Sequence, residues 1–239
     1  ESAVHQHDLE TKESKELFSA PSAITEIEFS PKGDSLFYLQ ADVFQNYSPI
    51  ASKRPHDFDV HEYNIAENEH IQHTDFKKYS MRSLTIAEDG QSVFVQMPDD
   101  EEVETAEDSF DLNLRIFQIP LDQPSNLKVV SDPNRKVDIY DFAVVPNETE
   151  FIFQSISNQD SGDIFQYELY KYNVETNEER QLTNLKEYTV NPVISSDNKI
   201  YFMVDKRFGQ RNADYHLYQM NMDGTEVKEI VLPNIENHQ

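Results

Sequence analysis

The chain of 239 residues has no cysteine, no tryptophan and only five glycines. Without a thiol there can be no disulfide, catalytic cysteine, thiolate zinc site or iron–sulfur cluster. No two glycines lie closer than fifteen residues along the chain. This spacing excludes a dinucleotide fingerprint, a phosphate-binding P-loop and a GxSxG nucleophile elbow, each of which needs two glycines within about six positions.

Positive charge is also scarce, because 20 lysines and arginines face 45 aspartates and glutamates and the formal net charge is −25. Binding to phosphate backbones or anionic membrane surfaces depends on neutralising their charge with Lys and Arg. We therefore expect no nucleic-acid partner. No apolar run approaches the roughly 20 residues that cross a bilayer, so we also expect no direct membrane insertion.

Apolar residues recur at every second position in short runs, which is the period of a half-buried strand. The runs are rich in Ile, Val, Phe and Tyr, which favour strands, and no stretch predicts a long amphipathic helix. The sequence therefore predicts an all-β chain. The clearest runs are residues 24–29, 35–40, 92–97, 150–155 and 199–204.

Two patterns repeat along the chain in phase, at intervals of about 50 residues. In the first, an alternating strand, a polar turn and a second apolar strand follow one another. The second pattern, a hairpin with its own polar turn, follows each copy of the first. Each unit therefore contains four strands in a meander, which predicts a β-propeller of four-stranded antiparallel blades, with a β-sandwich as the alternative. The equivalent positions of the first pattern, which we expect to be buried, are Phe29, Ile86, Val144 and Ile194.

The runs FSPKGDSLFYL (29–39) and LYKYNVETNEERQLT (169–183) resemble the WD40-like PD40 repeat of the TolB family of exported bacterial proteins. The resemblance covers about residues 24–232; it is close in the first and third units and looser in the second and fourth. It implies a propeller outside the cytoplasm of a bacterium, either secreted or anchored at the surface as in lipoproteins. Such repeats serve envelope scaffolds and the gating domains of prolyl-oligopeptidase-like peptidases, so the fold does not specify the function.

The expected organisation is a polar tail (1–13), a TolB-like propeller (14–233) and a C-terminal tail (234–239). Residues 14–19 resemble the final strand of a blade, yet they precede four units that are already complete. The alternatives are an excerpt of a larger ring, an open arc or a small ring. Since unpaired strand edges recruit neighbours, an open arc predicts a homodimer through its propeller edges. The four units span approximately residues 24–74, 81–130, 137–183 and 188–232.

Two long loops between second and third strands, residues 42–57 and 98–111, are expected on the binding face of the repeats. The first combines positive charge with aromatic residues, and the corresponding loop of the fourth unit carries a basic patch around a phenylalanine. Tyr and Arg are favoured anchors at interfaces, although a self-packed loop explains the same composition. The candidate partner contacts are Phe44, Tyr47, Lys53, Arg54, Arg207, Phe208 and Arg211.

Two further clusters have a functional and a structural interpretation. His56, His61, His70 and His73 fall within one unit, and His61 and His70 could be cross-strand neighbours that bind a metal. The alternative, which we favour, is a set of solvent-facing strand positions. The acidic run 99–108 could bind calcium or a basic partner, but like charges repel one another and favour a solvated loop.

No nucleophile and base occur at a spacing typical of a known catalytic family, so we expect no catalytic residues, no metal, no cofactor and no enzymatic activity. The leading hypothesis is a non-enzymatic exported propeller scaffold that binds a protein or a cell-envelope component. The competing hypothesis is the substrate-gating propeller of a larger prolyl-oligopeptidase-like peptidase.

Overall fold

The computed structural model describes residues 1–46, 53–100, 113–146, 148–159 and 164–231. These residues form β-strands and one short 3-10 helix, with no α-helix in the described ranges, which confirms the all-β prediction. The chain divides into two compact units, Glu1–Val130 and Ser131–Gln239, which are described separately.

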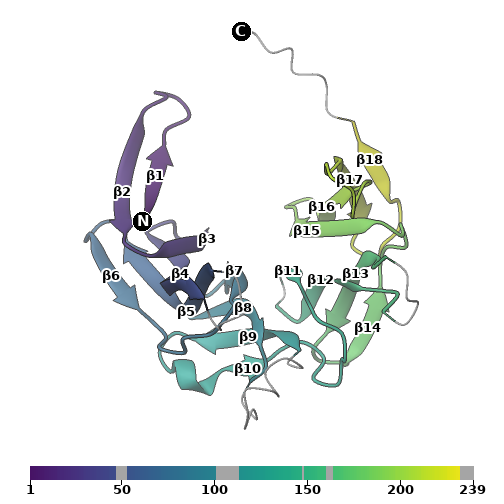
Figure 1. Cartoon of the computed structure of the whole chain (residues 1–239), viewed down its shortest axis with the longest axis horizontal. Helices are drawn as coiled ribbons and strands as arrows, with labels where there is room; N and C mark the ends of the chain where they lie inside the picture. The colour runs from purple at the N-terminus through teal and green to yellow at the C-terminus, as the bar shows by residue number, and fades with distance from the viewer. Residues whose placement is uncertain (47–52, 101–112, 147, 160–163, 232–239) are drawn as a thin grey trace. The chain divides into compact units, whose positions relative to one another are not determined.

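The first unit contains two four-stranded antiparallel sheets in which neighbouring strands follow chain order (Figure 1). The 3-10 helix η2 (Pro124–Asn126) lies between the last two strands of the second sheet. The first sheet consists of β3 (Ala23–Phe29), β4 (Ser35–Asn46), β5 (Lys53–Asn64) and β6 (Glu69–Gln72). The second consists of β7 (Arg82–Ile86), β8 (Ser92–Pro98), β9 (Leu114–Pro120) and β10 (Lys128–Val129).

The second unit contains two further four-stranded meanders, which are joined in one eight-stranded sheet. One parallel pairing, between Tyr167 of β13 and Tyr188 of β15, connects the two meanders. Each of the four blades is therefore a four-stranded antiparallel meander, and the chain has a β-propeller fold. The third blade consists of β11 (Asp141–Val144), β12 (Glu150–Ile156), β13 (Tyr167–Asn173) and β14 (Glu178–Gln181). The fourth consists of β15 (Tyr188–Ile194), β16 (Lys199–Asp205), β17 (Tyr215–Asn221) and β18 (Lys228–Ile230).

Each unit has an apolar core between its two blades. In the first unit, Leu39 and Val60 of the first blade pack in one cluster with Val95 and Phe117 of the second. The core of the second unit is built in the same way, with Leu169 of the third blade and Phe202 of the fourth among its members. Alternation along the central strands therefore buries one face of each blade against its neighbour.

The four repeat markers occupy equivalent places, because each is the last residue of the first strand of its blade. Phe29 pairs with Leu36, and the other three markers pair with the corresponding residue of the next strand. The prediction that they are buried is wrong: Phe29 is 55% exposed and the other three are half-buried. A period of two identifies the face of a strand but does not tell whether another element covers that face.

The N-terminal residues are not a polar tail as expected. β1 (Ser2–His7) pairs antiparallel with β2 (Ser14–Ala20), and the resulting hairpin packs Val4 and Phe18 against the first blade. Its turn has the geometry of the outer hairpin of the third blade: Asp8 Oδ1 accepts hydrogen bonds from the backbone N–H of the residues two and three positions on, both at 2.8 Å. Asn173 does the same in the third blade, at 3.0 and 2.9 Å. An Asx turn therefore orders a segment whose composition is that of a tail.

The first long loop is shorter than the predicted range 42–57. β4 continues to Asn46 and β5 begins at Lys53, and Phe44 pairs with Pro55 in the ladder between them. Extended strand pairing therefore places the candidate residues Phe44 and Lys53 on the two arms of a long hairpin.

Candidate functional site

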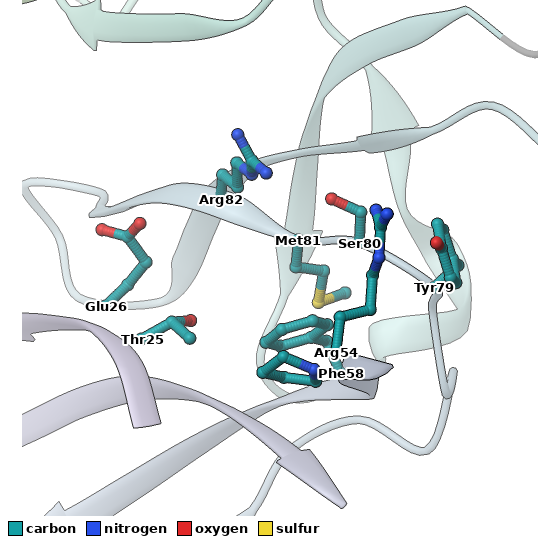
Figure 2. Close-up of a pocket in the computed structure, with 9 residues that line it drawn as sticks. Thr25, Glu26, Arg54, Phe58, Tyr79, Ser80, Met81 and Arg82 are labelled. Carbon is teal, nitrogen blue, oxygen red and sulfur yellow. The ribbon is translucent and has the colours of Figure 1, made fainter. Parts of the chain in front are cut away.

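A pocket of about 500 Å³ lies within the first unit, where the first and second blades meet (Figure 2). Three segments line it: the beginning of β3, the beginning of β5, and the connection that leads from β6 into β7. The residues are Thr25, Glu26, Arg54, Pro55, Phe58, Tyr79, Ser80, Met81 and Arg82.

Irregular pairing of β3 and β7, the first strands of the two blades, shapes one side of this pocket. The register of β3 against β4 shifts between Ile24 and Glu26, and that of β7 against β8 shifts between Arg82 and Thr85. A β-bulge bends its strand and redirects the side chains beside it. Glu26 and Arg82 thereby line the pocket from neighbouring blades.

Backbone pairing fixes the connection that forms the other side. Phe58 N donates to Lys78 O at 2.8 Å, and Lys78 N donates to Phe58 O at 3.2 Å. This bridge holds the connection against β5 immediately before Tyr79. These two hydrogen bonds therefore hold the backbone directly before the lining residues 79–82.

The interior of the pocket is apolar and its rim is charged. Phe58 is 7% exposed and Met81 is 1% exposed, and both belong to the apolar core of the unit. Arg54 and Arg82 are exposed, and Figure 2 shows their guanidinium groups above Met81 and Phe58, with the hydroxyl of Ser80 between them in this view. The pocket thus combines apolar contact with several hydrogen-bond donors.

The two arginines differ from several other cations of the chain because neither has a carboxylate partner among the described residues. Lys171 pairs with Glu150 at 2.7 Å, and Lys206 pairs with Glu229 at the same distance. Arg54 Cζ lies 5.7 Å from the centroid of the Tyr79 ring, a cation–π contact that leaves its N–H groups available. The pocket therefore carries positive charge in a strongly acidic protein.

The predicted contact residues separate into several places. Arg54 lines the pocket, whereas Lys53 lies 4.5 Å over the ring of Phe44 on the extended hairpin, and Tyr47 falls outside the described residues. In the second unit, Phe208 stacks on Tyr188 with ring centroids 4.4 Å apart. Flanking it in the sequence, Arg207 Nε lies 3.4 Å from Asp214 Oδ2 and Arg211 is exposed.

Sequence reasoning missed Arg82, Tyr79 and Ser80, which line the pocket beside Arg54. The signal available was their position. Tyr79 and Ser80 lie in the connection between the first two blades, and Arg82 is the first residue of β7. Such connections lie where successive blades meet, and loops on a repeat scaffold are frequent binding sites.

The histidines of the first unit make aromatic and ionic contacts. His61 pairs with Gln72 and His70 with Tyr63, so the two are not direct cross-strand neighbours. Nδ1 of His70 lies 2.9 Å from the hydroxyl of Tyr38, and Nε2 of His73 lies 2.8 Å from Glu62 Oε2. Within the described ranges no three His, Cys, Asp or Glu side chains are grouped so as to hold a metal ion.

Most of the acidic run 99–108 falls outside the described residues. At its beginning, Asp100 forms an ion pair with Lys78 of the connection beside the pocket. Among the described residues, no helix is both long and apolar enough to span a membrane.

No protein-family model matches the sequence, and no curated protein sequence does so either. Solved structures do match. A protein from Agrobacterium tumefaciens assigned to TolB aligns over 97% of this chain and 70% of its own, with a TM-score of 0.67 and 15% identity. TolB from Acinetobacter baumannii aligns over 95% of this chain and 48% of its own, with a TM-score of 0.64 and 16% identity.

Proteins of other functions share the fold. A chain of a nidogen/laminin complex aligns over 92% of this chain and 69% of its own, with a TM-score of 0.62 and 10% identity. A prolyl endopeptidase aligns over 97% of this chain and 33% of its own, with a TM-score of 0.60 and 10% identity. At these identities the similarity establishes a TolB-like β-propeller fold and leaves function to the site.

Proposed function

We propose that this chain is a non-enzymatic binding scaffold, located outside the cytoplasm of a bacterium, whose pocket between the first and second blades contacts a protein or another component of the cell envelope. The observation that carries the proposal is the pair Arg54 and Arg82, which lie over an apolar interior without a carboxylate partner among the described residues. Arginine and buried aromatic residues are favoured anchors of protein interfaces. The nidogen/laminin match supports a role in protein binding, because that propeller was solved in a complex.

The test is a photo-crosslinking residue introduced at Tyr79, on the pocket wall, with Tyr201 of β16 in the second unit as the matched control position. After incubation with envelope proteins, we expect a specific adduct from position 79 and none from position 201. The adduct protein, once purified, should bind the unmodified chain. Arg54→Glu should abolish that binding, while Arg180→Glu, at an exposed position of β14, should leave it intact. Equal labelling at both positions, or binding insensitive to Arg54→Glu, contradicts the proposal.

The alternative is the gating propeller of a larger prolyl-oligopeptidase-like peptidase, which the prolyl endopeptidase match favours. This chain spans 33% of that enzyme, 70% of one TolB structure and 48% of the other. An α/β-hydrolase domain encoded in the same gene would decide for the peptidase. A signal peptide with a lipobox would decide for the surface scaffold.

Association through propeller edges belongs to the same proposal. Two chains of net charge −25 repel each other, and added salt screens this repulsion. A homodimer should therefore become tighter as salt is added, which sedimentation across a range of salt concentrations measures. A monomer under all conditions contradicts this part of the proposal.

A further inference from the structure

The chemistry of the pocket identifies a narrower ligand class, on the premise that the proposed function is correct. We infer that the pocket binds the free C-terminal carboxylate of a partner peptide whose last residue is apolar. The carboxylate lies between Arg54 and Arg82, and the last side chain packs against Pro55, beside the buried Phe58 and Met81.

The first step is the donor set. Arginine presents its N–H groups in a planar fork that matches a carboxylate, and hydrogen bonds between such charged groups are stronger than neutral ones. Arg54 and Arg82 supply two such forks from different blades, and Figure 2 shows the Ser80 hydroxyl between them in this view. Neither fork has a carboxylate partner among the described residues, so an incoming anion displaces no ion pair of the protein there.

The second step is the sign and amount of charge. Glu26 also lines the pocket, and the whole chain carries a net charge of −25. Both features oppose ligands with several negative charges, such as phosphates. Two arginines against one glutamate leave a local charge of +1, which suits a single carboxylate.

The third step is the apolar surface directly below the donors. Pro55 is half-buried and presents accessible apolar surface, and the almost wholly buried Phe58 and Met81 form the wall behind it. A C-terminal residue carries its carboxylate and its side chain on the same Cα, so both can be satisfied within one compact site. The volume of about 500 Å³ lies in the range of roughly 300–1,000 Å³ typical of small-ligand pockets.

The experiment compares matched fluorescent peptides by anisotropy against the full chain. One peptide ends in leucine with a free carboxylate, one is its C-terminal amide, and one carries an internal aspartate with an amidated end. We expect the free acid to bind at least about tenfold more tightly than either amide, since charged hydrogen bonds account for the difference. Arg54→Gln and Arg82→Gln should each remove about that factor, and the surface variant Arg180→Gln, at an exposed position of β14, should not.

Exposed positions such as 54 and 82 tolerate substitution, and circular dichroism checks that each variant is folded. Equal affinity for acid and amide, or no binding of any peptide, overturns the inference. Binding of an acidic oligosaccharide with the same arginine dependence also overturns it, in favour of a sugar acid. If the peptides fail but position 79 still crosslinks to a partner, the proposed function survives and only the carboxylate inference is lost. The reverse result leaves a carboxylate site that is not used by an envelope partner.

Discussion

The buried hydroxyl of Thr183, which follows β14, forms hydrogen bonds to β13 in the third blade. Its removal should lower the free energy of unfolding. Thr183 Oγ1 donates to Glu168 Oε2 at 2.5 Å and accepts from Leu169 N at 2.9 Å. Lys186 N donates to the other oxygen of Glu168 at 2.6 Å. Thr183 is 2% exposed and Glu168 is 0% exposed, so water does not replace a lost partner.

Thr183→Val keeps the shape of the side chain but removes both hydrogen bonds. Leu169 N then lacks its acceptor, which costs about 1–3 kcal/mol, and the carboxylate of Glu168 loses one of its donors. We expect the free energy of unfolding of the second unit to fall by about 2–4 kcal/mol. Thr176→Val, at an exposed hairpin turn, is the matched control and should change it by less than about 0.5 kcal/mol.

Urea unfolding followed by far-UV circular dichroism measures the effect, with tyrosine fluorescence as a second probe in a chain of 12 tyrosines and no tryptophan. The slope of the transition should be unchanged, because the surface exposed on unfolding is the same. If Thr183→Val unfolds at the same urea concentration as Thr176→Val, the hydrogen bonds assigned to Thr183 do not stabilise the blade.

Two further predictions concern His61 and Gly224. Burial lowers the pKa of His61 below 6.5, and this effect is larger than the opposing effect of Asp42. As the pH falls, His61 therefore takes up a proton in the unfolded chain before it does so in the folded one. The stability of the first unit should fall as the pH drops below about 6.5. A stability profile from pH 8 to 5 that is no flatter in His61→Gln would contradict this. At Gly224, where φ is +79°, a Cβ would lie 2.9 Å from the carbonyl oxygen of Leu182, so Gly224→Ala should cost at least about 2 kcal/mol. Gly33→Ala, with φ of +71° and nothing within 4 Å of the added Cβ, should cost about 1 kcal/mol in the same urea assay, and equal losses would refute the contribution of the contact.

The alternation and the in-phase repeat were sufficient to predict the blades, because period-two patterning and turn residues are local properties of the chain. Burial of Phe29 could not be predicted in this way, since it depends on which element covers its side of β3. The pocket was beyond sequence reasoning for a similar reason. Arg54 and Arg82 belong to different blades, and tertiary contacts such as the pairing of Phe58 with Lys78 hold the connection that precedes Arg82.

The N-terminal hairpin illustrates a different failure. His5, Gln6 and His7 are polar and exposed, and the composition of the first thirteen residues is that of a tail. The turn around Asp8 was the missed signal: Lys12 has a φ of +62°, as Asn177 has +56° at the equivalent place in the third blade. Turn chemistry was thus a better guide to structure here than hydropathy.

Thr74 in the first blade makes the same kind of hydrogen bonds as Thr183, and it lies close in the sequence to the residues that line the pocket. Thr74 Oγ1 accepts from Val60 N at 2.9 Å and donates to Asp59 Oδ1 at 2.6 Å. Phe76 N also donates to Asp59 Oδ1, at 2.6 Å. These hydrogen bonds therefore hold the chain directly after β6, a few residues before the segment 79–82 that lines the pocket.

Thr74→Val should consequently have two effects where Thr183→Val has one. Both variants should destabilise their own unit by a similar amount, since each threonine hydroxyl accepts from one backbone N–H and donates to one buried carboxylate. Only Thr74→Val should also weaken binding at the pocket, because it loosens the connection that positions Ser80 and Arg82. The measurement is peptide affinity and partner crosslinking under conditions in which both variants remain folded. Equal affinity in the two variants would show that the bridge between Phe58 and Lys78 positions the pocket without help from Thr74.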